Sequence, residues 1–326
     1  MDRSADTTAG HHEPVMLDEV LAVLRPRSGG FYCDGTAGRG GHAQALLEAS
    51  GPDGRLLAID RDPTAVDAVR RRLEPFGGRA AVVHARFGAL PQVLGEMGLG
   101  RLDGLLLDLG VSLPQLEEPS RGFSFQREGP IDMRLDPTEG ETALELIERL
   151  SEEELAGVIH ELGEERRARV VARTLKAALR RGDLATTTDL ARAVRRAVGA
   201  RRAGRIDSAT RSFQALRIAV NDELGELGSV LENLPDLLAD GGRAAFISFH
   251  SLEDRAVKRG LRRWSSCRCE PRVPRCRCGG ARLGVVTGGK PVTAGDDEVL
   301  RNPRARSAKL RAAERLPRAP GESACQ

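Results

Sequence analysis

Four short apolar runs, separated by helical segments, fill the first third of this 326-residue chain. The runs FYCD (31–34), RLLAID (55–60) and AAVVHARF (80–87) are typical of strands. LDGLLLDLG (102–110) is a continuous apolar run of the kind found in a strand that is covered on both faces. The stretches between them, including PTAVDAVRRRL with Pro63 in its first turn, have helical patterns. This alternation predicts βαβ units, a parallel sheet and therefore an α/β fold.

The alternation is interrupted and then resumes at GGRAAFISFH (241–250), which follows an amphipathic segment over 213–234 that predicts one helix. The intervening residues have no strong strand pattern and read as helical. We therefore expect a sheet domain into which an all-helical domain is inserted, and we expect the inserted domain to recognise the substrate. The predicted ranges are 1–116 with 213–326 for the sheet domain and 117–212 for the insertion.

Charge is distributed unevenly along a chain whose net charge is only +3. Residues 166–217 hold 15 Lys and Arg against 3 Asp and Glu, and residues 255–318 hold 18 against 5. Two basic blocks on an otherwise acidic chain favour a polyanion-binding face over ordinary solvated surface charge. The 30% of charged residues and the lack of any apolar run near the ~18 residues of a membrane span argue against a membrane protein. The N-terminal residues have no apolar signal-peptide core, so we expect a cytoplasmic protein.

One predicted helix, at 166–181, would carry a stripe of cations. Its basic residues recur with spacings of 3, 4, 3 and 4, which places them on one face: Arg166, Arg169, Arg173, Lys176 and Arg180. An opposing apolar stripe consists of Val171, Leu175 and Ala178. The stripe either follows the phosphates of an RNA strand or is a solvated face paired with the preceding acidic helices at 142–150 and 152–159.

The segment DGTAGRGGH (34–42) and Asp60 together predict a site for a nucleoside cofactor. A glycine-rich turn allows close approach to the backbone, and the helix that follows offers free N–H groups. Asp60, at the tip of the next strand, is placed to accept the hydroxyls of a ribose. The glycines also fit a dinucleotide pattern, so a nicotinamide-dependent oxidoreductase is an alternative. Asp34 favours S-adenosylmethionine, because a carboxylate there repels a pyrophosphate but suits an amino group.

The fourth strand ends at Asp108, where ligands of open α/β sheets bind. The loops RGFSFQ (121–126) and SFHSLED (248–254) would supply the opposite wall. Their aromatic residues are candidates for base stacking, with core packing as the alternative for each: Phe123, Phe125 and Phe249.

Four cysteines form the unusual pattern CRC…CRC (267–278). Thiolates in such a set bind zinc, although zinc sites more often use C-x-x-C, and a reduced surface loop is the alternative. The metal therefore stays undetermined at Cys267, Cys269, Cys276 and Cys278. Cys33 is expected to be a buried strand residue.

Several ordered blocks over 12–315 resemble the bacterial small-subunit rRNA cytosine-N4 methyltransferases (RsmH/MraW type). They are HEPVML, DGTAGRGGH, AIDRDP, LLLDLGVS, RGFSF with GPIDMR, RSFQALRIAVNDEL, ISFHSLEDR and NPRARSAKLRAAER. The resemblance implies a class I (Rossmann-like) methyltransferase fold and a bacterial cytoplasmic enzyme. It also implies methylation of a cytidine N4 in the decoding region of 16S rRNA, on naked rRNA or the assembled small subunit. We expect no obligate protein partner.

The resemblance also implies which residues contact the cofactor. By position, the family's contacts fall on Gly40, Gly41, His42, Asp60, Phe87, Asp108 and Gln115. One departure is Leu113, where the family usually has a second serine. The zinc-like cysteine loop is not a general feature of the family.

Cytosine's exocyclic amine is a poor nucleophile, so the enzyme must orient it and accept its hydrogens. Asp108 or the carbonyl of Leu109 is the candidate acceptor, and an equally weighted alternative is that Asp108 only holds the cofactor. Two other functions stay open on the sequence: the oxidoreductase, and an rRNA-binding assembly factor with a vestigial pocket.

Overall fold

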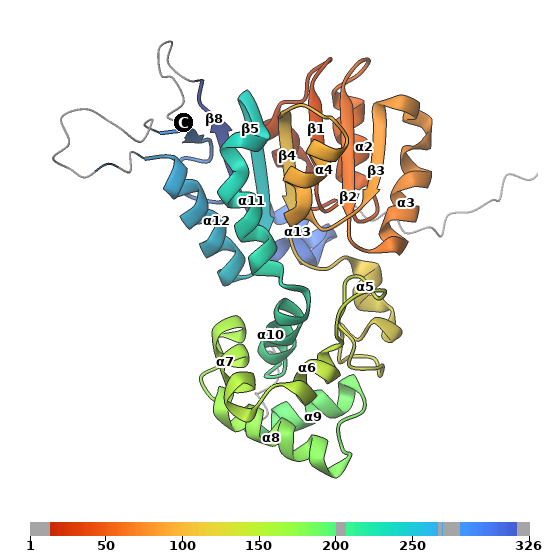
Figure 1. Cartoon of the computed structure of the whole chain (residues 1–326), viewed down its shortest axis with the longest axis vertical. Coiled ribbons are helices and arrows are strands. Elements are labelled where there is room, and N and C mark those ends of the chain that lie inside the picture. The colour runs from red at the N-terminus through yellow and green to blue at the C-terminus, as the bar shows by residue number, and fades with distance from the viewer. Residues whose placement is uncertain (1–13, 200–206, 267–268, 270–280, 318–326) are drawn as a thin grey trace, which may run out of the picture. The chain divides into compact units, whose positions relative to one another are not determined.

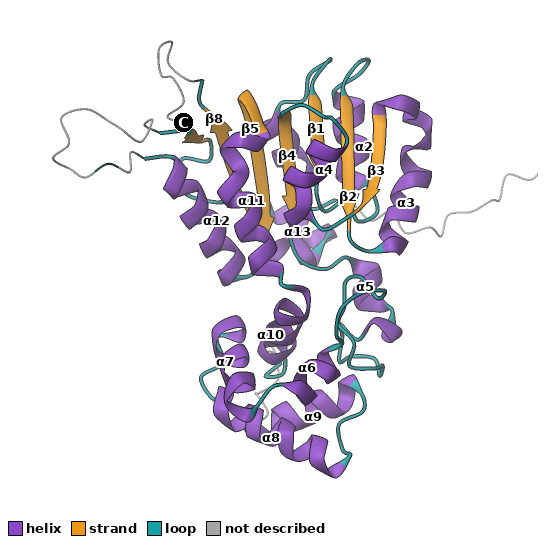
Figure 2. Cartoon of the chain, viewed as in Figure 1, coloured by secondary structure: helices purple, strands orange, loops and turns teal. Residues whose placement is uncertain are grey.

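The computed structural model describes residues 14–199, 207–266, 269 and 281–317 (Figures 1 and 2). The chain divides into two compact units, residues 1–110 with 227–326 and residues 111–226. The first unit contains an eight-stranded sheet, and the second is built of helices with a single isolated bridge in its described part, between Pro130 and Thr186. The predicted α/β fold class is confirmed. No helix in the described ranges has the length and apolar character needed to cross a bilayer.

The sheet of the first unit has the strand order β3-β2-β1-β4-β5-β8-β6, with β7 paired to β8. The first five strands along the chain are parallel, whereas β8 is antiparallel to β5. Chain order reverses beside β1, which pairs with β2 on one side and β4 on the other. The bounds are β1 Phe31–Asp34, β2 Arg55–Asp60, β3 Ala80–His84, β4 Leu102–Asp108, β5 Leu238–Ser248, β6 Leu283–Val285, β7 Val292–Thr293 and β8 Lys309–Arg315.

Both faces of this sheet are covered, which explains the continuous apolar run of β4. Leu105 and Leu107 pack in one core, while Leu106, between them, packs in the other. The first core includes α4 (Leu90–Glu96), the α11 residues from 227 onward and α12 (Ser251–Trp264); the second includes α1 (Leu17–Leu24), α2 (Gly41–Ala49) and α3 (Pro63–Leu73). A central strand that is buried on both faces has no solvent-facing side, so its sequence does not alternate between polar and apolar residues.

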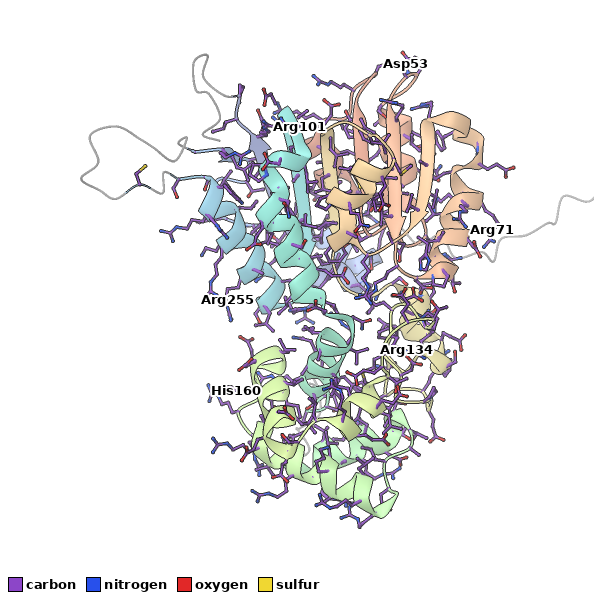
Figure 3. All side chains as sticks on the ribbon, in the orientation of Figure 1. Asp53, Arg71, Arg101, Arg134, His160 and Arg255 are labelled. Carbon is purple, nitrogen blue, oxygen red and sulfur yellow. The ribbon has the colours of Figure 1, made fainter. Side chains whose placement is uncertain are left out.

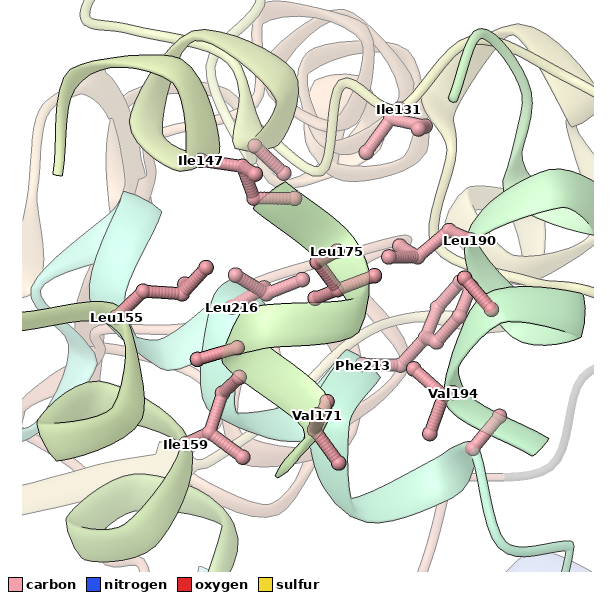
Figure 4. Packing of buried hydrophobic residues seen from close by; sticks show 14 of the residues in the cluster. Ile131, Ile147, Leu155, Ile159, Val171, Leu175, Leu190, Val194, Phe213 and Leu216 are labelled. Atoms are coloured by element: carbon pink, nitrogen blue, oxygen red, sulfur yellow. The ribbon is translucent and has the colours of Figure 1, made fainter. Parts of the chain in front are cut away.

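The second unit contains short helices, several of which begin with a reciprocal cap. Thr142 with Glu145, Ser151 with Glu154 and Thr186 with Asp189 form capping boxes at α6, α7 and α9. Apolar side chains from α6, α7, α8, α9 and α10 form its single core (Figure 4). The bounds are α5 Leu113–Glu117, α6 Ala143–Arg149, α7 Glu152–Gly163, α8 Ala168–Arg181, α9 Thr187–Val198 and α10 Thr210–Asn221.

The prediction of one helix over 213–234 is wrong. The segment forms α10 and α11 (Glu223–Leu237), separated by Asp222, whose φ of 48° is left-handed. Phe213 and Leu216 of α10 belong to the core of the second unit. That unit is therefore wider at both ends than the expected insertion, because α10 supplies part of its core.

The cation stripe differs from its prediction in two respects. Arg166 precedes α8, which begins at Ala168. Lys176 is half-buried, and its Nζ donates to the carbonyls of Ile147 (2.6 Å) and Glu148 (3.1 Å) near the end of α6. The exposed cations of the helix face are Arg169, Arg173 and Arg180, of which Arg173 approaches Glu152 at 3.3 Å. The opposing stripe of Val171, Leu175 and Ala178 is buried, as predicted.

Candidate active site

Three carboxyl side chains end three adjacent parallel strands of the first unit. Asp34 is the last residue of β1, Asp60 of β2 and Asp108 of β4. Because β1 lies between β2 and β4, the three residues share one edge of the sheet at the point where chain order reverses. This is where open α/β sheets bind ligands.

The glycine turn between β1 and α2 is fixed to the neighbouring strand. Asp60 Oδ2 accepts the Gly38 amide at 2.7 Å, and the Ala37 amide donates to Ile59 O at 3.0 Å. Gly38 and Gly40 have φ values of 54° and 78°, a conformation that favours glycine. The turn therefore presents bare backbone at the start of α2, beside the strand-end carboxyls.

Asp60 is partly buried and already accepts backbone donors with both oxygens, since Oδ1 accepts the Asp62 amide at 2.8 Å. Burial raises the pKa of Asp60 to about 6, although these amide hydrogen bonds favour the carboxylate. The Arg61 amide is a third backbone donor to this carboxylate, and the acceptor capacity that remains among its roughly four sites is available for hydroxyl donors.

Asp34 is 1% exposed, and its Oδ1 accepts the Thr36 amide at 3.2 Å. Its Oδ2 is buried and has no hydrogen-bond partner among the described residues. Burial raises the pKa of Asp34 to about 7; the backbone amides of Thr36 and Ala43 oppose this rise, and the nearby charge of Asp60 adds to it. A buried acceptor without a donor indicates a ligand that brings one.

Asp108 has a similar unsatisfied oxygen. Its amide donates to Thr36 Oγ1 at 2.6 Å, and His42 Nε2 lies 3.7 Å from its Oδ2. Oδ1 is buried without a hydrogen-bond partner in the part of the chain that the structure describes. Burial raises the pKa of Asp108 to about 8; the charge of Asp34 adds to this rise, whereas Arg304 opposes it.

Sequence reasoning missed three residues around Asp108: Thr36, Glu253 and Arg304. Glu253 is 2% exposed and accepts the amides of Phe249 (2.8 Å) and His250 (3.3 Å), so it fixes the loop between β5 and α12. Its charge also raises the pKa of Asp108. The blocks ISFHSLEDR and NPRARS contain Glu253 and Arg304, but no spacing rule connects either residue to Asp108.

The structure brings six of the predicted site residues together in the first unit: Asp34, Gly40, Gly41, His42, Asp60 and Asp108. Phe87 joins them, because a Cβ built on Gly35 would lie 3.4 Å from the Phe87 Cβ. Phe87 lies in a 3-10 turn rather than in β3, so the predicted strand over 80–87 is too long. Gln115 belongs to the second unit, where its Oε1 accepts the Ser112 amide at 2.8 Å and closes the cap of α5.

The proposed stacking aromatics are largely packed. Phe123 lies in the core of the second unit, and Phe125 packs edge-on against Phe213 with centroids 5.0 Å apart. Phe249 is partly buried against a core of the first unit. Of the four candidate zinc ligands, only Cys269 is among the described residues, and Cys33 is buried in β1 as predicted.

Comparison with known proteins extends over nearly the whole chain. The MraW methylase family profile matches residues 9–316. The chain is 54% identical over 307 residues to the ribosomal RNA small subunit methyltransferase H of Sorangium cellulosum, covering 94% of this chain and 91% of that protein. It is 52% identical over 309 residues to the protein of the same name from Geobacter sulfurreducens, covering 94% and 99%. The resemblance noted in the sequence is confirmed.

Proposed function

The chain belongs to the MraW methylase family, and from this premise we propose that it methylates the exocyclic N4 of a cytidine in the decoding region of 16S rRNA, with S-adenosylmethionine as donor. Relatives about half identical to it are named as methyltransferases of small-subunit rRNA. The cytidine N4 target and its decoding-region position come from the resemblance of the ordered sequence blocks. The reaction belongs in the cytoplasm, on naked rRNA or on the assembled subunit, and needs no obligate protein partner.

The observation that carries this proposal is the buried, unsatisfied Oδ2 of Asp34 beside the glycine turn, with the carboxylate of Asp60 at the end of the next strand. Asp34 Oδ2 suits the amino group of S-adenosylmethionine, and the Asp60 carboxylate suits its ribose hydroxyls. A nicotinamide dinucleotide fits less well, since its pyrophosphate would meet the carboxyl of Asp34. When bound, S-adenosylmethionine supplies an electrophilic methyl group.

Asp108 is the group we assign to the cytosine amine. Its buried Oδ1 is a preorganised acceptor for an N–H that becomes more acidic as the amine attacks. Thr36 fixes the backbone of Asp108, and His42 lies against its other oxygen. The competing role, in which Asp108 only holds the cofactor, follows from the family contacts and predicts a different mutant phenotype, argued below.

A direct test is mass spectrometry of 16S rRNA from a strain that lacks the gene. We expect one decoding-region cytidine to lose its N4 methyl group, and the parent gene to restore it. An Asp108→Ala gene should restore little or none, whereas Asp53→Ala, at an exposed residue of the first unit, should restore it fully. An unchanged methylation pattern in the deletion strain would refute the assigned target.

A further inference from the structure

The helical unit contains a cavity of about 370 Å³ that no step of the proposed chemistry uses. It lies where two helices begin: Arg166 and Arg167 immediately precede α8, and Ser208 and Arg211 flank the first residue of α10. Its lining residues are Glu165, Arg166, Arg167, Val198, Ser208 and Arg211. The N-terminus of a helix carries a partial positive charge, so two such ends favour an anion in this cavity.

Cations outnumber anions around the cavity. The guanidinium groups of Arg166 and Arg167 form no ion pair or hydrogen bond with described residues, and both side chains are exposed. Arg211 Nη1 donates to the carbonyl of Glu164 at 3.3 Å and lies 4.0 Å from Glu165 Oε2. Three guanidinium groups therefore face one carboxylate.

Glu165, that carboxylate, is occupied by partners of its own. It is 6% exposed, and its Oε1 accepts the Arg167 amide at 2.9 Å. Its other oxygen faces Arg211, so Glu165 orients one of the cations. The nearby Asp207 is also neutralised, because Arg195 pairs with it at 2.8 Å. Neither acid cancels the charges of Arg166 and Arg167, whose guanidinium groups have no partner in the described part of the chain.

Ser208 adds a buried hydroxyl group to the basic side chains that line this cavity. Its side chain is 6% exposed, and its Oγ has no hydrogen-bond partner in the described structure. A buried hydroxyl needs a partner, and a hydroxyl that lines the same cavity as three guanidinium groups suits a ligand rich in acceptor oxygens. We propose that the cavity binds a phosphate of the RNA backbone, held by Arg166, Arg167, Arg211 and the Ser208 hydroxyl. The inference rests on the proposed function, which supplies the RNA.

Ser208→Ala in the full chain tests the proposal, with binding of a fluorescent decoding-region fragment of 16S rRNA as the readout. We expect affinity to fall about tenfold, because the hydroxyl would donate to a charged oxygen. The melting temperature should not fall, since the hydroxyl has no hydrogen-bond partner among the residues that the structure describes. Ser212→Ala is the matched control: Ser212 Oγ in α10 is likewise buried and has no hydrogen-bond partner in the described ranges, but the residue is not among those that line the cavity.

The cations are tested by salt dependence. Arg166→Gln should lower the slope of log affinity against log salt by about 0.7, the value for one lost contact to a single strand. Arg71→Gln is the charge-matched control, because Arg71 projects from α3 of the other unit and has no partner among described residues (Figure 3). Equal slopes in the Arg166 variant and the parent would overturn the proposal.

Two further outcomes are decisive. The phosphate site is refuted if Ser208→Ala binds RNA as tightly as the parent does. It is also refuted if Ser208→Ala loses no more affinity than Ser212→Ala. If the parent binds inorganic phosphate in a Ser208-dependent way while RNA affinity is insensitive to Ser208, the cavity holds free phosphate and the RNA assignment is overturned. Methyl transfer to 16S rRNA is measured in parallel. If the parent methylates rRNA and both Ser208→Ala and Arg166→Gln bind RNA as the parent does, only the phosphate site is refuted. If the parent neither binds nor methylates rRNA, both the phosphate site and the proposed function are refuted.

Discussion

At the scale of single residues, the strand-end carboxyls share one electrostatic property. Burial raises the pKa of Asp34 to about 7 and that of Asp108 to about 8. Both groups therefore bind protons in a pH range where an exposed aspartate is ionised. A cationic ligand favours their ionised forms, so ligand binding and proton release should be coupled.

We expect the affinity for S-adenosylmethionine to rise with pH up to about 7, the pKa of Asp34. Below that value a proton competes with the ligand's amino group for the carboxylate, which costs up to about tenfold in affinity per pH unit. Calorimetry in buffers of different ionisation enthalpy would measure both the affinity and the proton release. Asp34→Asn should bind weakly with a flat pH profile; a flat profile in the parent would remove Asp34 from the amino-group site.

Asp60→Ala should lower cofactor affinity a hundredfold or more. Charge-assisted hydrogen bonds contribute ~1.5–3 kcal/mol each, and the ribose would lose two. The Gly38 amide would also lose its acceptor, so the glycine turn would loosen. Asp60→Asn, which keeps one acceptor oxygen, should lose less. Unchanged affinity by calorimetry in the alanine variant would exclude Asp60 from the site.

Asp108→Ala separates the two roles considered for this residue. If Oδ1 accepts the cytosine amine, turnover should fall by far more than cofactor affinity, because a contact made in the transition state lowers kcat without weakening ground-state binding. Single-turnover methylation and calorimetry on the same preparation give the two numbers. Equal losses in both would identify Asp108 as a cofactor ligand only.

The same residues mark how far sequence reasoning reaches into the site. Asp34, Asp60 and Asp108 were predictable because each ends a strand whose apolar pattern is clear. The contacts that shape Asp108 were not, because Thr36 and Arg304 lie 72 and 196 positions away in the chain and meet Asp108 only in the folded unit. Sequence patterns therefore predict where strands end, but they do not predict electrostatic interactions between residues that are far apart in the chain.

At the scale of elements, how well the range of a helix or strand is predicted depends on how the packing around that segment shapes its sequence. β1, β2, α3 and β4 match their predicted ranges closely, since burial on defined faces imposes the apolar pattern. β8 (Lys309–Arg315) was not predicted, because its sequence KLRAAER favours a helix by composition. Pairing with β5 overrides that preference, and the buried Arg311 and Arg315 are held by Asp254 (2.7 Å) and Asp240 (3.1 Å).

The cations of α8 should fall into two groups. If the stripe follows the phosphates of a single RNA strand, replacing the exposed Arg169 and Arg180 by Gln should lower the salt slope of RNA binding by about 1.4, which is about 0.7 for each lost contact. Lys176→Met should leave the slope unchanged but destabilise the helical unit by about 1–2 kcal/mol, since two carbonyls of α6 lose their donor. Urea unfolding and salt titration of both variants test this division; a slope change in Lys176→Met alone would reverse it.

At the scale of the whole molecule, the helical unit (111–226) is inserted into the sequence of the sheet unit (1–110 with 227–326). The sequence predicted the interruption from the change in periodicity, but it misplaced the boundaries because α10 is amphipathic whichever core it joins. Only the packing of Phe213 and Leu216 assigns α10 to the helical unit. Each core consists of residues from one unit alone.

Separate cores predict separate unfolding. We expect calorimetry of the full chain to show two transitions, because the two cores of the sheet unit and the core of the helical unit each consist of side chains from their own unit. S-adenosylmethionine at 100 times its Kd should stabilise the transition of the sheet unit by about 2.7 kcal/mol, since Asp34, Asp60 and the glycine turn all lie there. The transition of the helical unit should move less. The isolated fragment 111–226 identifies the helical transition; a single transition that the ligand shifts as a whole would show that the two units unfold as one.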